Sequence, residues 1–159
     1  MRRVLLLLCG SRQGQAMLRY ASLSNQSMNS AQTFEAATIL VIDDSATMRR
    51  CLASYLDEAG YRVVLAEDGF DALAKIGDCR PALIVCDIVM PRLDGYRTCA
   101  LVRGHAGFHA TPVLMLSSRD GLFDRARGSM AGASDCLVKP LAREALLAAV
   151  RQQLAAVAN

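Results

Sequence analysis

The sequence predicts an α/β protein with a five-stranded parallel sheet and helices on both of its faces. From residue 38 onward, short aliphatic runs alternate with helical stretches, which is the pattern of strands joined by crossover helices. The runs are almost continuously apolar, as expected for strands that are buried on both faces. The predicted strands are 39–42, 63–65, 83–86, 113–116 and 136–138.

The stretches between and after these runs have helical spacing. The clearest is 46–59, in which Leu52 and Leu56 share one apolar face. Ser45 is a suitable N-cap for this helix, and Gly60 is placed to end it. The other predicted helices are 70–76, 96–102, 122–130 and 142–157. Right-handed crossovers then distribute the helices over both faces of the sheet.

Length and composition limit the classes of function. With 159 residues, 53% of them hydrophobic and 21% charged, the chain has the size and composition of one ordinary globular domain. A net charge of +3 with scattered basic residues argues against a nucleic-acid partner. The six cysteines include no C-x-x-C pair, so we expect unpaired thiols in a reducing cytoplasm. We therefore expect a cytoplasmic protein with no membrane insertion.

Residues 1–37 differ in character from the rest of the chain. Met1-Arg2-Arg3 and the apolar residues after it imitate the start of a secretory signal, but the apolar run is shorter than a signal needs. The following polar stretch has no sustained period. We therefore predict a poorly ordered extension at 1–37 and a folded domain at 38–157. A true start at Met17 or Met28 accounts equally well for this segment.

Polar residues follow four of the predicted strands. In a sheet of flavodoxin-like order 2-1-3-4-5, the carboxyl ends of these strands lie at one edge, beside the point where the strand order reverses. The side chains expected to converge there are Asp43 and Asp44 after the first strand, Asp87 after the third, Ser117 after the fourth and Lys139 after the fifth.

This set of side chains has the chemistry of a phosphoryl-accepting site. Three carboxylates placed close together repel one another unless a cation shares the site. Mg²⁺ suits them because it prefers oxygen ligands and leaves positions open for phosphate oxygens. A carboxylate beside the ion can attack a phosphoryl donor, and a lysine can neutralise the product. The sequence therefore predicts a reversible charge switch.

Four segments resemble the successive motifs of bacterial response-regulator receiver domains, the CheY-like family. They are ILVIDDSATMRR, LIVCDIVMPRLDGY, PVLMLSSRDG and CLVKP, and the resemblance covers residues 38–157. The segments DGFDALAKI and SSRDGLFDRARG are most similar to single-domain receivers of the PilG type, which serve chemotaxis-like systems controlling type IV pilus twitching.

The resemblance implies a role for each residue of the cluster. Asp87 corresponds to the phosphoacceptor and Lys139 to the lysine that binds the phosphoryl group. Pro140 is a candidate for the family's cis peptide, and Ser117 corresponds to the hydroxyl that moves toward the phosphorylated aspartate. The implied Mg²⁺ site comprises Asp44 as a direct ligand, Asp43 as the acid that holds metal-bound water, Asp87, and the backbone carbonyl of Val89.

Two positions depart from the family pattern. Cys136 stands where the family usually has a Tyr or Phe that turns inward on activation, and Leu141 replaces a common Phe. These departures leave open how the aromatic part of the switch works. A small thiol side chain at position 136 would still allow phosphorylation.

The resemblance also implies partners. The expected donor is a CheA-like sensor histidine kinase, and the protein is expected to be a switch and not an enzyme. Because only two residues follow Val157, we expect the output to be binding of a motility effector protein. In this family the binding surface comprises the fourth helix, the last strand and the last helix, which correspond here to 122–130, 136–138 and 142–157.

Other functions on the same architecture would need residues that differ from those present. A phosphatase of the haloacid-dehalogenase type would need a second Asp at position 89, where Val stands. A flavin or nucleotide site would need a phosphate-binding loop where Asp43 and Asp44 stand. A constitutive adaptor that is never phosphorylated, or a receiver in another pathway, stays open.

Several residues also have purely structural interpretations. Asp43 and Asp44, taken alone, could merely cap a helix, and Asp94-Gly95 is predicted to be a turn. Arg125 and Arg127 are predicted to lie on a solvated helix face. Only the joint arrangement at the strand ends favours a site over these interpretations.

Overall fold

The computed structural model describes residues 36–118 and 122–158. The predicted extension lies outside these residues except for its last two positions. The two candidate start residues and Cys9 lie outside them as well.

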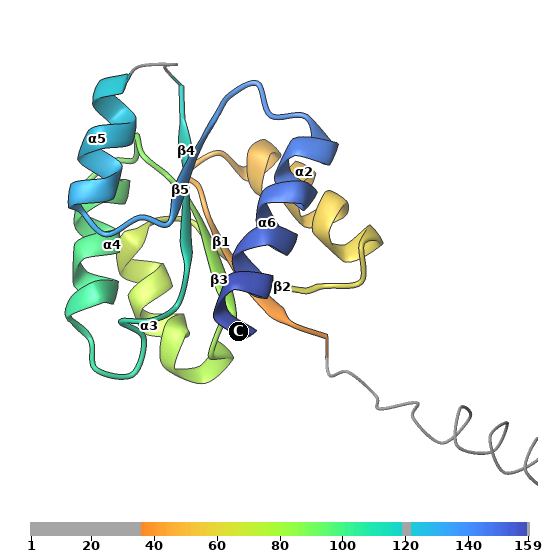
Figure 1. Cartoon of the computed structure of the whole chain (residues 1–159), viewed down its shortest axis with the longest axis horizontal. Helices are drawn as coiled ribbons and strands as arrows, with labels where there is room; N and C mark the ends of the chain where they lie inside the picture. The colour runs from red at the N-terminus through yellow and green to blue at the C-terminus, as the bar shows by residue number, and fades with distance from the viewer. Residues whose placement is uncertain (1–35, 119–121, 159) are drawn as a thin grey trace, which may run out of the picture. The chain divides into compact units, whose positions relative to one another are not determined.

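Strands and helices alternate along the described chain (Figure 1). The elements are β1 (Thr38–Ile42), α2 (Ala46–Glu58), β2 (Arg62–Ala66), α3 (Gly69–Cys79), β3 (Leu83–Asp87), α4 (Gly95–Gly104), β4 (Val113–Ser117), α5 (Leu122–Met130), β5 (Asp135–Val138) and α6 (Arg143–Ala158). Every predicted strand and helix is present, with α3 and α4 extending beyond their predicted ends.

The strands form one sheet in the order β2-β1-β3-β4-β5, and all four pairings are parallel. This confirms the predicted strand order. The three central strands are the most deeply buried, and all residues of β3 and β4 are buried. Their continuous apolar runs follow from this position, because both faces of each central strand are covered by helices.

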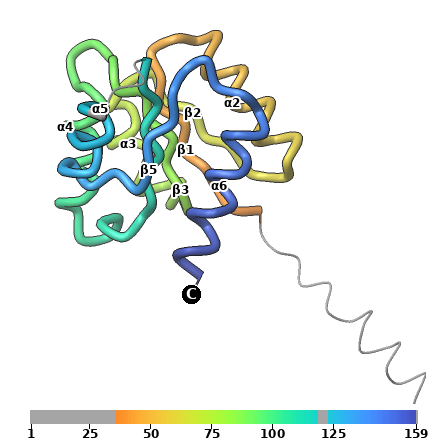
Figure 2. Tube along the Cα trace, turned by 45° about the horizontal axis from the view of Figure 1, so that its top comes forward, coloured from red at the N-terminus to blue at the C-terminus, as the bar shows by residue number. Residues whose placement is uncertain are grey.

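Helices α3, α4 and α5 cover one face of the sheet, and α2 and α6 cover the other (Figures 1 and 2). Each face has its own apolar cluster. Leu40 and Ile42 of β1 pack with the α3–α4 face, whereas Ile39 and Val41 pack with α2 and α6. The side-chain alternation of a strand thus divides one apolar run between two cores.

Side-chain caps fix where the helices begin. Ser45 caps α2, as predicted, and its Oγ accepts a hydrogen bond from the backbone N of Met48 at 3.3 Å. The predicted turn at Asp94-Gly95 is wrong, because Asp94 is the N-cap of α4 and Gly95 is its first residue. The Asp94 side chain accepts from the backbone N of Arg97 at 2.8 Å, so the sequence signal for a turn here marks a helix start.

The cysteines within the described ranges are all free, as predicted: Cys51, Cys79, Cys86, Cys99 and Cys136. Three of them are buried, and Cys51 and Cys79 are half-buried. Across the same residues, no helix is both long enough and apolar enough to cross a bilayer.

Candidate functional site

The register of the sheet brings the polar strand ends together. Ile42, which precedes Asp43, pairs with Cys86, which precedes Asp87. On the other side of β3, Asp87 pairs with Leu116, the residue before Ser117. Residues that follow neighbouring parallel strands therefore share the carboxyl edge, as the sequence predicted.

Three carboxylates meet at this edge. Single oxygen atoms of Asp43, Asp44 and Asp87 all lie within 4.8 Å of one another. Asp43 is fully buried and Asp87 is 4% exposed, whereas Asp44 is exposed. We call these three side chains the acidic cluster. Its two inner members are shielded from water, so their charges interact strongly.

Lys139 lies between the two buried acids. Its Nζ is 3.0 Å from Oδ2 of Asp43 and 3.0 Å from Oδ1 of Asp87. The peptide bond between Lys139 and Pro140 is cis, which confirms that prediction. One ammonium group thus joins acids from two different strands.

The electrostatics of the site follow from burial and crowding. Burial raises the pKa of Asp87, and the neighbouring Asp43 and Asp44 raise it further, although Lys139 opposes them. For Lys139, burial alone would lower the pKa, but the hydrogen bond to Asp43 and the charge attraction to Asp43 and Asp87 outweigh it and raise the pKa. Lys139 therefore stays charged, while the ionised form of Asp87 is less favourable in the folded protein than in water.

The loop after β1 is held in place around Asp43. Its Oδ1 accepts a hydrogen bond from the backbone N of Ser45 at 2.8 Å. Its backbone carbonyl accepts from Nη1 of Arg49, on α2, at 2.7 Å. These contacts fix the direction of the carboxylate before any ligand binds.

Gly95 allows α4 to start directly behind Asp87. Its backbone N donates to the carbonyl of Ile88 at 2.9 Å. A Cβ atom added at Gly95 would lie 2.3 Å from the carbonyl oxygen of Asp87, closer than atoms can approach. A larger residue would therefore displace the backbone that carries Asp87.

The acidic cluster fits a divalent cation. Oδ1 of Asp87 is buried, and among the described residues it has an ion pair with the Lys139 ammonium but no hydrogen bond. Buried carboxylate oxygens of this kind are normally satisfied, and a hard cation satisfies them well. Val89 lies two residues after Asp87, and the residue is 66% exposed. Its role through the backbone carbonyl stays a prediction.

Ser117 closes the site on the β4 side. It is 1% exposed, and its Oγ donates a hydrogen bond to Oδ2 of Asp124, in the first turn of α5, at 2.6 Å. Asp124 was not predicted to belong to the site, because this pairing joins two elements through a side-chain contact that no local motif requires.

Comparison with known proteins shows to which family the chain belongs. The model of the response regulator receiver domain matches residues 39–151. The chain belongs to this family. A curated relative, Protein PilG of Pseudomonas aeruginosa, is 51% identical over 120 residues, which cover 76% of this chain and 89% of PilG. Response regulator MprA of Mycobacterium tuberculosis is 45% identical over 116 residues, which cover 73% of this chain but only 50% of MprA.

Solved structures agree with the fold of this receiver. Chemotaxis protein CheY4 of Vibrio cholerae superposes with a TM-score of 0.71 at 35% identity, covering 74% of this chain and 98% of CheY4. The receiver domain of sensor histidine kinase PA1611 from Pseudomonas aeruginosa has a TM-score of 0.70 at 28% identity, covering 76% of this chain and 98% of that domain. In that crystal structure a magnesium ion is coordinated in the active-site cleft. The predicted family, fold and likeness to PilG are therefore confirmed.

The loop between β3 and α4 is tied to the start of α3. Arg92, whose φ of 67° is left-handed, makes an ion pair with the buried N-cap Asp68, and its guanidinium carbon lies 5.8 Å from the centre of the Phe70 ring. This tie holds the loop that contains Val89. The sequence did not reveal it because the two partners are far apart along the chain.

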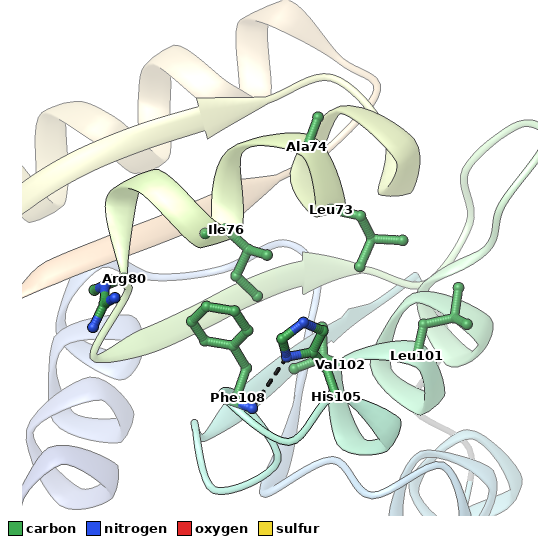
Figure 3. A pocket seen from close by; sticks show the side chains of 10 residues that line it. Leu73, Ala74, Ile76, Arg80, Leu101, Val102, His105 and Phe108 are labelled. Atoms are coloured by element: carbon green, nitrogen blue, oxygen red, sulfur yellow. Dashed lines mark hydrogen bonds between the residues drawn. The ribbon is translucent and has the colours of Figure 1, made fainter.

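A cavity of about 520 Å³ lies between the C-terminal halves of α3 and α4, away from the acidic cluster. Figure 3 shows Leu73, Ile76, Val102 and Phe108 around it, with His105 beside Phe108. Nδ1 of His105 accepts a hydrogen bond from the backbone N of Gly107 at 3.1 Å. The lining is mainly apolar and contains no carboxylate, so this cavity lacks the groups for phosphoryl chemistry.

Proposed function

We propose that this protein is a single-domain response regulator, phosphorylated on Asp87 with the help of Mg²⁺. The observation that carries the proposal is the environment of Asp87, which is buried beside Asp43 and Lys139 and has a side-chain oxygen without a hydrogen bond among the described residues. An oxygen in this state is available as a nucleophile, and the adjacent ammonium favours added negative charge.

In the proposed reaction, an oxygen of Asp87 attacks the phosphorus of a phosphohistidine on a sensor kinase. The P–N bond breaks, the imidazole leaves with the electron pair, and an acyl phosphate forms on Asp87. Lys139 balances the charge on the phosphoryl oxygens, and Ser117 donates a hydrogen bond to one of them. When bound to Asp43, Asp44, Asp87 and the carbonyl of Val89, Mg²⁺ would supply charge neutralisation at the transferring group.

Intact-mass measurement tests the acceptor directly. Incubation with acetyl phosphate and Mg²⁺ is expected to add the mass of one phosphoryl group to the wild type and none to Asp87→Asn. Asp57→Asn removes an exposed carboxylate of α2 and serves as the matched control. Equal labelling of the Asp87 variant and the wild type would overturn the assignment, and removal of divalent ions with EDTA should prevent labelling.

The proposed pathway is a chemotaxis-like system that controls type IV pilus twitching in the cytoplasm. The 51% identity to PilG over most of both chains supports it. The donor would be a CheA-like kinase, and the output would be binding of a motility effector to the surface of α5, β5 and α6. Purified pilus-system kinase should transfer its phosphoryl group to this receiver much faster than an unrelated sensor kinase does, and equal rates would contradict the pathway.

The proposed domain organisation is an extension at 1–37 followed by the receiver at 38–157. A constitutive adaptor is the second candidate, favoured only by the small Cys136 at the usual aromatic position. An adaptor would bind its partner equally well with and without phosphorylation, so partner affinity in the two states separates the candidates.

A further inference from the structure

Tyr96 is a buried aromatic residue close to the position where Cys136 replaces the family's aromatic residue. It lies in the first turn of α4, is 8% exposed and belongs to the same buried cluster as Cys136. Its side chain reaches this cluster from a different element of the fold. The region therefore contains an aromatic hydroxyl although position 136 does not provide one.

The Tyr96 hydroxyl and the Ser117 hydroxyl bind the same carboxylate. Oη of Tyr96 donates to Oδ1 of Asp124 at 3.0 Å, and Oγ of Ser117 donates to Oδ2 of Asp124 at 2.6 Å. Asp124 thus bridges the end of β4 and the start of α4 from the first turn of α5. Short hydrogen bonds to a carboxylate are among the stronger ones in proteins.

The contact extends to the surface of α5. The guanidinium carbon of Arg127 lies 4.3 Å from the centre of the Tyr96 ring, a cation–π distance. Burial and the hydrogen bond to Asp124 raise the pKa of Tyr96 to about 12, so its hydroxyl keeps its proton at neutral pH. Arg127 was predicted to be a solvated residue. Although exposed, it covers the buried tyrosine.

The network begins next to the phosphoacceptor strand. Ser117 follows Leu116, which pairs with Asp87, and Tyr96 follows Gly95, which packs against the carbonyl of Asp87. The single proton of the Ser117 hydroxyl can be donated to one acceptor at a time. A phosphoryl group on Asp87 and the carboxylate of Asp124 would therefore compete for it.

We propose that Asp124 and Tyr96 are positioning residues. In the unphosphorylated protein they hold the Ser117 hydroxyl away from the phosphoacceptor, and when Ser117 leaves Asp124 they change how firmly α5 is held. The inference rests on the proposed phosphorylation of Asp87. When Ser117 turns to the phosphoryl group, Asp124 loses its hydrogen bond from Ser117, while the hydrogen bond from Tyr96 and the packing of Arg127 on the Tyr96 ring still join α5 to α4. The signal then reaches the surface without an aromatic residue at position 136.

Competition for one proton predicts which arrangement a variant favours. If Asp124 binds the Ser117 hydroxyl less tightly, that hydroxyl is more available, so the arrangement of the phosphorylated protein is favoured before any phosphoryl group arrives. Tyr96→Phe removes one hydroxyl and keeps the ring on which Arg127 packs. It is expected to loosen α5 in the unmodified protein and to reduce the additional change on phosphorylation.

Hydrogen exchange of the amides in 122–130, measured by mass spectrometry in the unmodified protein, tests the network without any phosphorylation. Tyr96→Phe and Ser117→Ala are each expected to speed exchange about fivefold, the effect of one lost hydrogen bond. The double variant should be no faster than either single variant, because both act through Asp124. Tyr61→Phe, in the cluster on the other face of the sheet, is the matched control.

Exchange in 122–130 that is unchanged in both variants, or effects that add in the double variant, would overturn the network. The same measurement is then made after phosphorylation with acetyl phosphate, with the mass of each protein recorded in parallel. The wild type should show faster exchange, and Tyr96→Phe should show less than about half of that increase.

The two proposals fail in different ways. If the masses show phosphorylation and Tyr96→Phe responds fully, the network is wrong and the phosphoacceptor assignment stands. If no protein gains mass, the phosphoacceptor assignment fails, and the exchange of the unmodified variants still decides whether Asp124 couples Ser117 to α5.

Discussion

The two edges of the sheet are built on opposite principles. At the carboxyl edge, two buried carboxylates share a single ammonium group and an exposed third carboxylate lies close to them, and one buried oxygen has no hydrogen bond among the described residues. At the amino edge, Arg103 of α4 donates to the carbonyls of Gly132, His109 and Thr111 and so joins two loops. The first edge concentrates unfavourable charge, whereas the second satisfies backbone groups.

This difference assigns the carboxyl edge to function and the amino edge to stability. Charge crowding at the carboxyl edge is unfavourable until a cation neutralises part of it, which makes the edge responsive to a divalent ion. The contacts at the amino edge do not depend on a bound cation. Substitutions at the first edge should therefore alter the response to Mg²⁺, and substitutions at the second should alter stability alone.

The largest effect is expected from Lys139→Met in the absence of divalent ions. It leaves Asp43 and Asp87 buried without their shared ammonium, and we expect a loss of about 3 kcal/mol in the free energy of unfolding. Urea unfolding in EDTA measures this loss. Added Mg²⁺ should recover part of it, because a cation restores the missing positive charge.

Lys75→Met is the matched control for Lys139→Met. Lys75 also binds an aspartate, Asp71, at 2.7 Å, but its side chain is 44% exposed. We expect a loss below about 1 kcal/mol with no dependence on Mg²⁺. Similar losses for the two lysine variants would contradict the special character of the carboxyl edge.

The next largest effect is expected from Arg103→Ala at the amino edge. Nε of Arg103 donates to the carbonyl of Gly132 at 2.7 Å, and half-buried carbonyls lose their donor when the side chain is removed. We expect a loss of about 2 kcal/mol in thermal or urea unfolding. Mg²⁺ affinity and phosphorylation should match the wild type, whereas a changed Mg²⁺ affinity would break the proposed separation of the two edges.

Arg97→Ala is the control for Arg103→Ala: it removes an exposed arginine from the same helix and should change stability by less than about 0.5 kcal/mol.

Gly132 adds a structural reason for the position of Arg103. Its φ is +92°, and a Cβ atom there would lie 2.7 Å from Cγ of Arg103. The arginine side chain therefore packs against a turn that favours glycine.

Apart from the two control variants, the smallest effect is expected from Asp87→Asn, and it has the opposite sign. Because burial and the neighbouring acids raise the pKa of Asp87 in the folded protein, its ionised form disfavours folding at neutral pH. In EDTA at neutral pH, we expect the variant to be about 1 kcal/mol more stable than the wild type.

The pH dependence of this difference follows from its sign. The unfolded chain releases the Asp87 proton at a lower pH than the folded chain does, so the wild type loses stability as the pH rises through the interval between the two pKa values. Below that interval both forms are neutral, and the advantage of the variant should disappear. An advantage that grows as the pH falls would contradict the assigned pKa direction.

Much of the fold and of the acidic cluster was predictable because both depend on short-range patterns. Each central strand has an apolar run that ends in a polar residue, and parallel pairing then places Asp43 and Asp87 at one edge without further information. Ser45 as the cap of α2 is a local signal of the same kind. The strand order came with the resemblance and is confirmed by the pairings.

The missed features are side-chain contacts between distant elements. Nothing local to Tyr96 or Asp124 indicates that they bind one another across 28 positions of sequence. The pair Asp94-Gly95 does carry a local signal, but the signal marks the start of a helix and not the predicted turn. The role of Gly95 depends on a close approach to Asp87, which only the packing of α4 behind β3 reveals.

Calorimetric titration with Mg²⁺ tests the central claim most directly, because the account requires the acidic cluster to hold one divalent cation. The wild type is expected to bind a single ion, and Asp43→Asn, which changes a fully buried member of the cluster, should abolish that binding. Asp57→Asn should bind like the wild type. A wild type that takes up no Mg²⁺, or an Asp43→Asn variant that binds it as tightly as the wild type, would contradict the account.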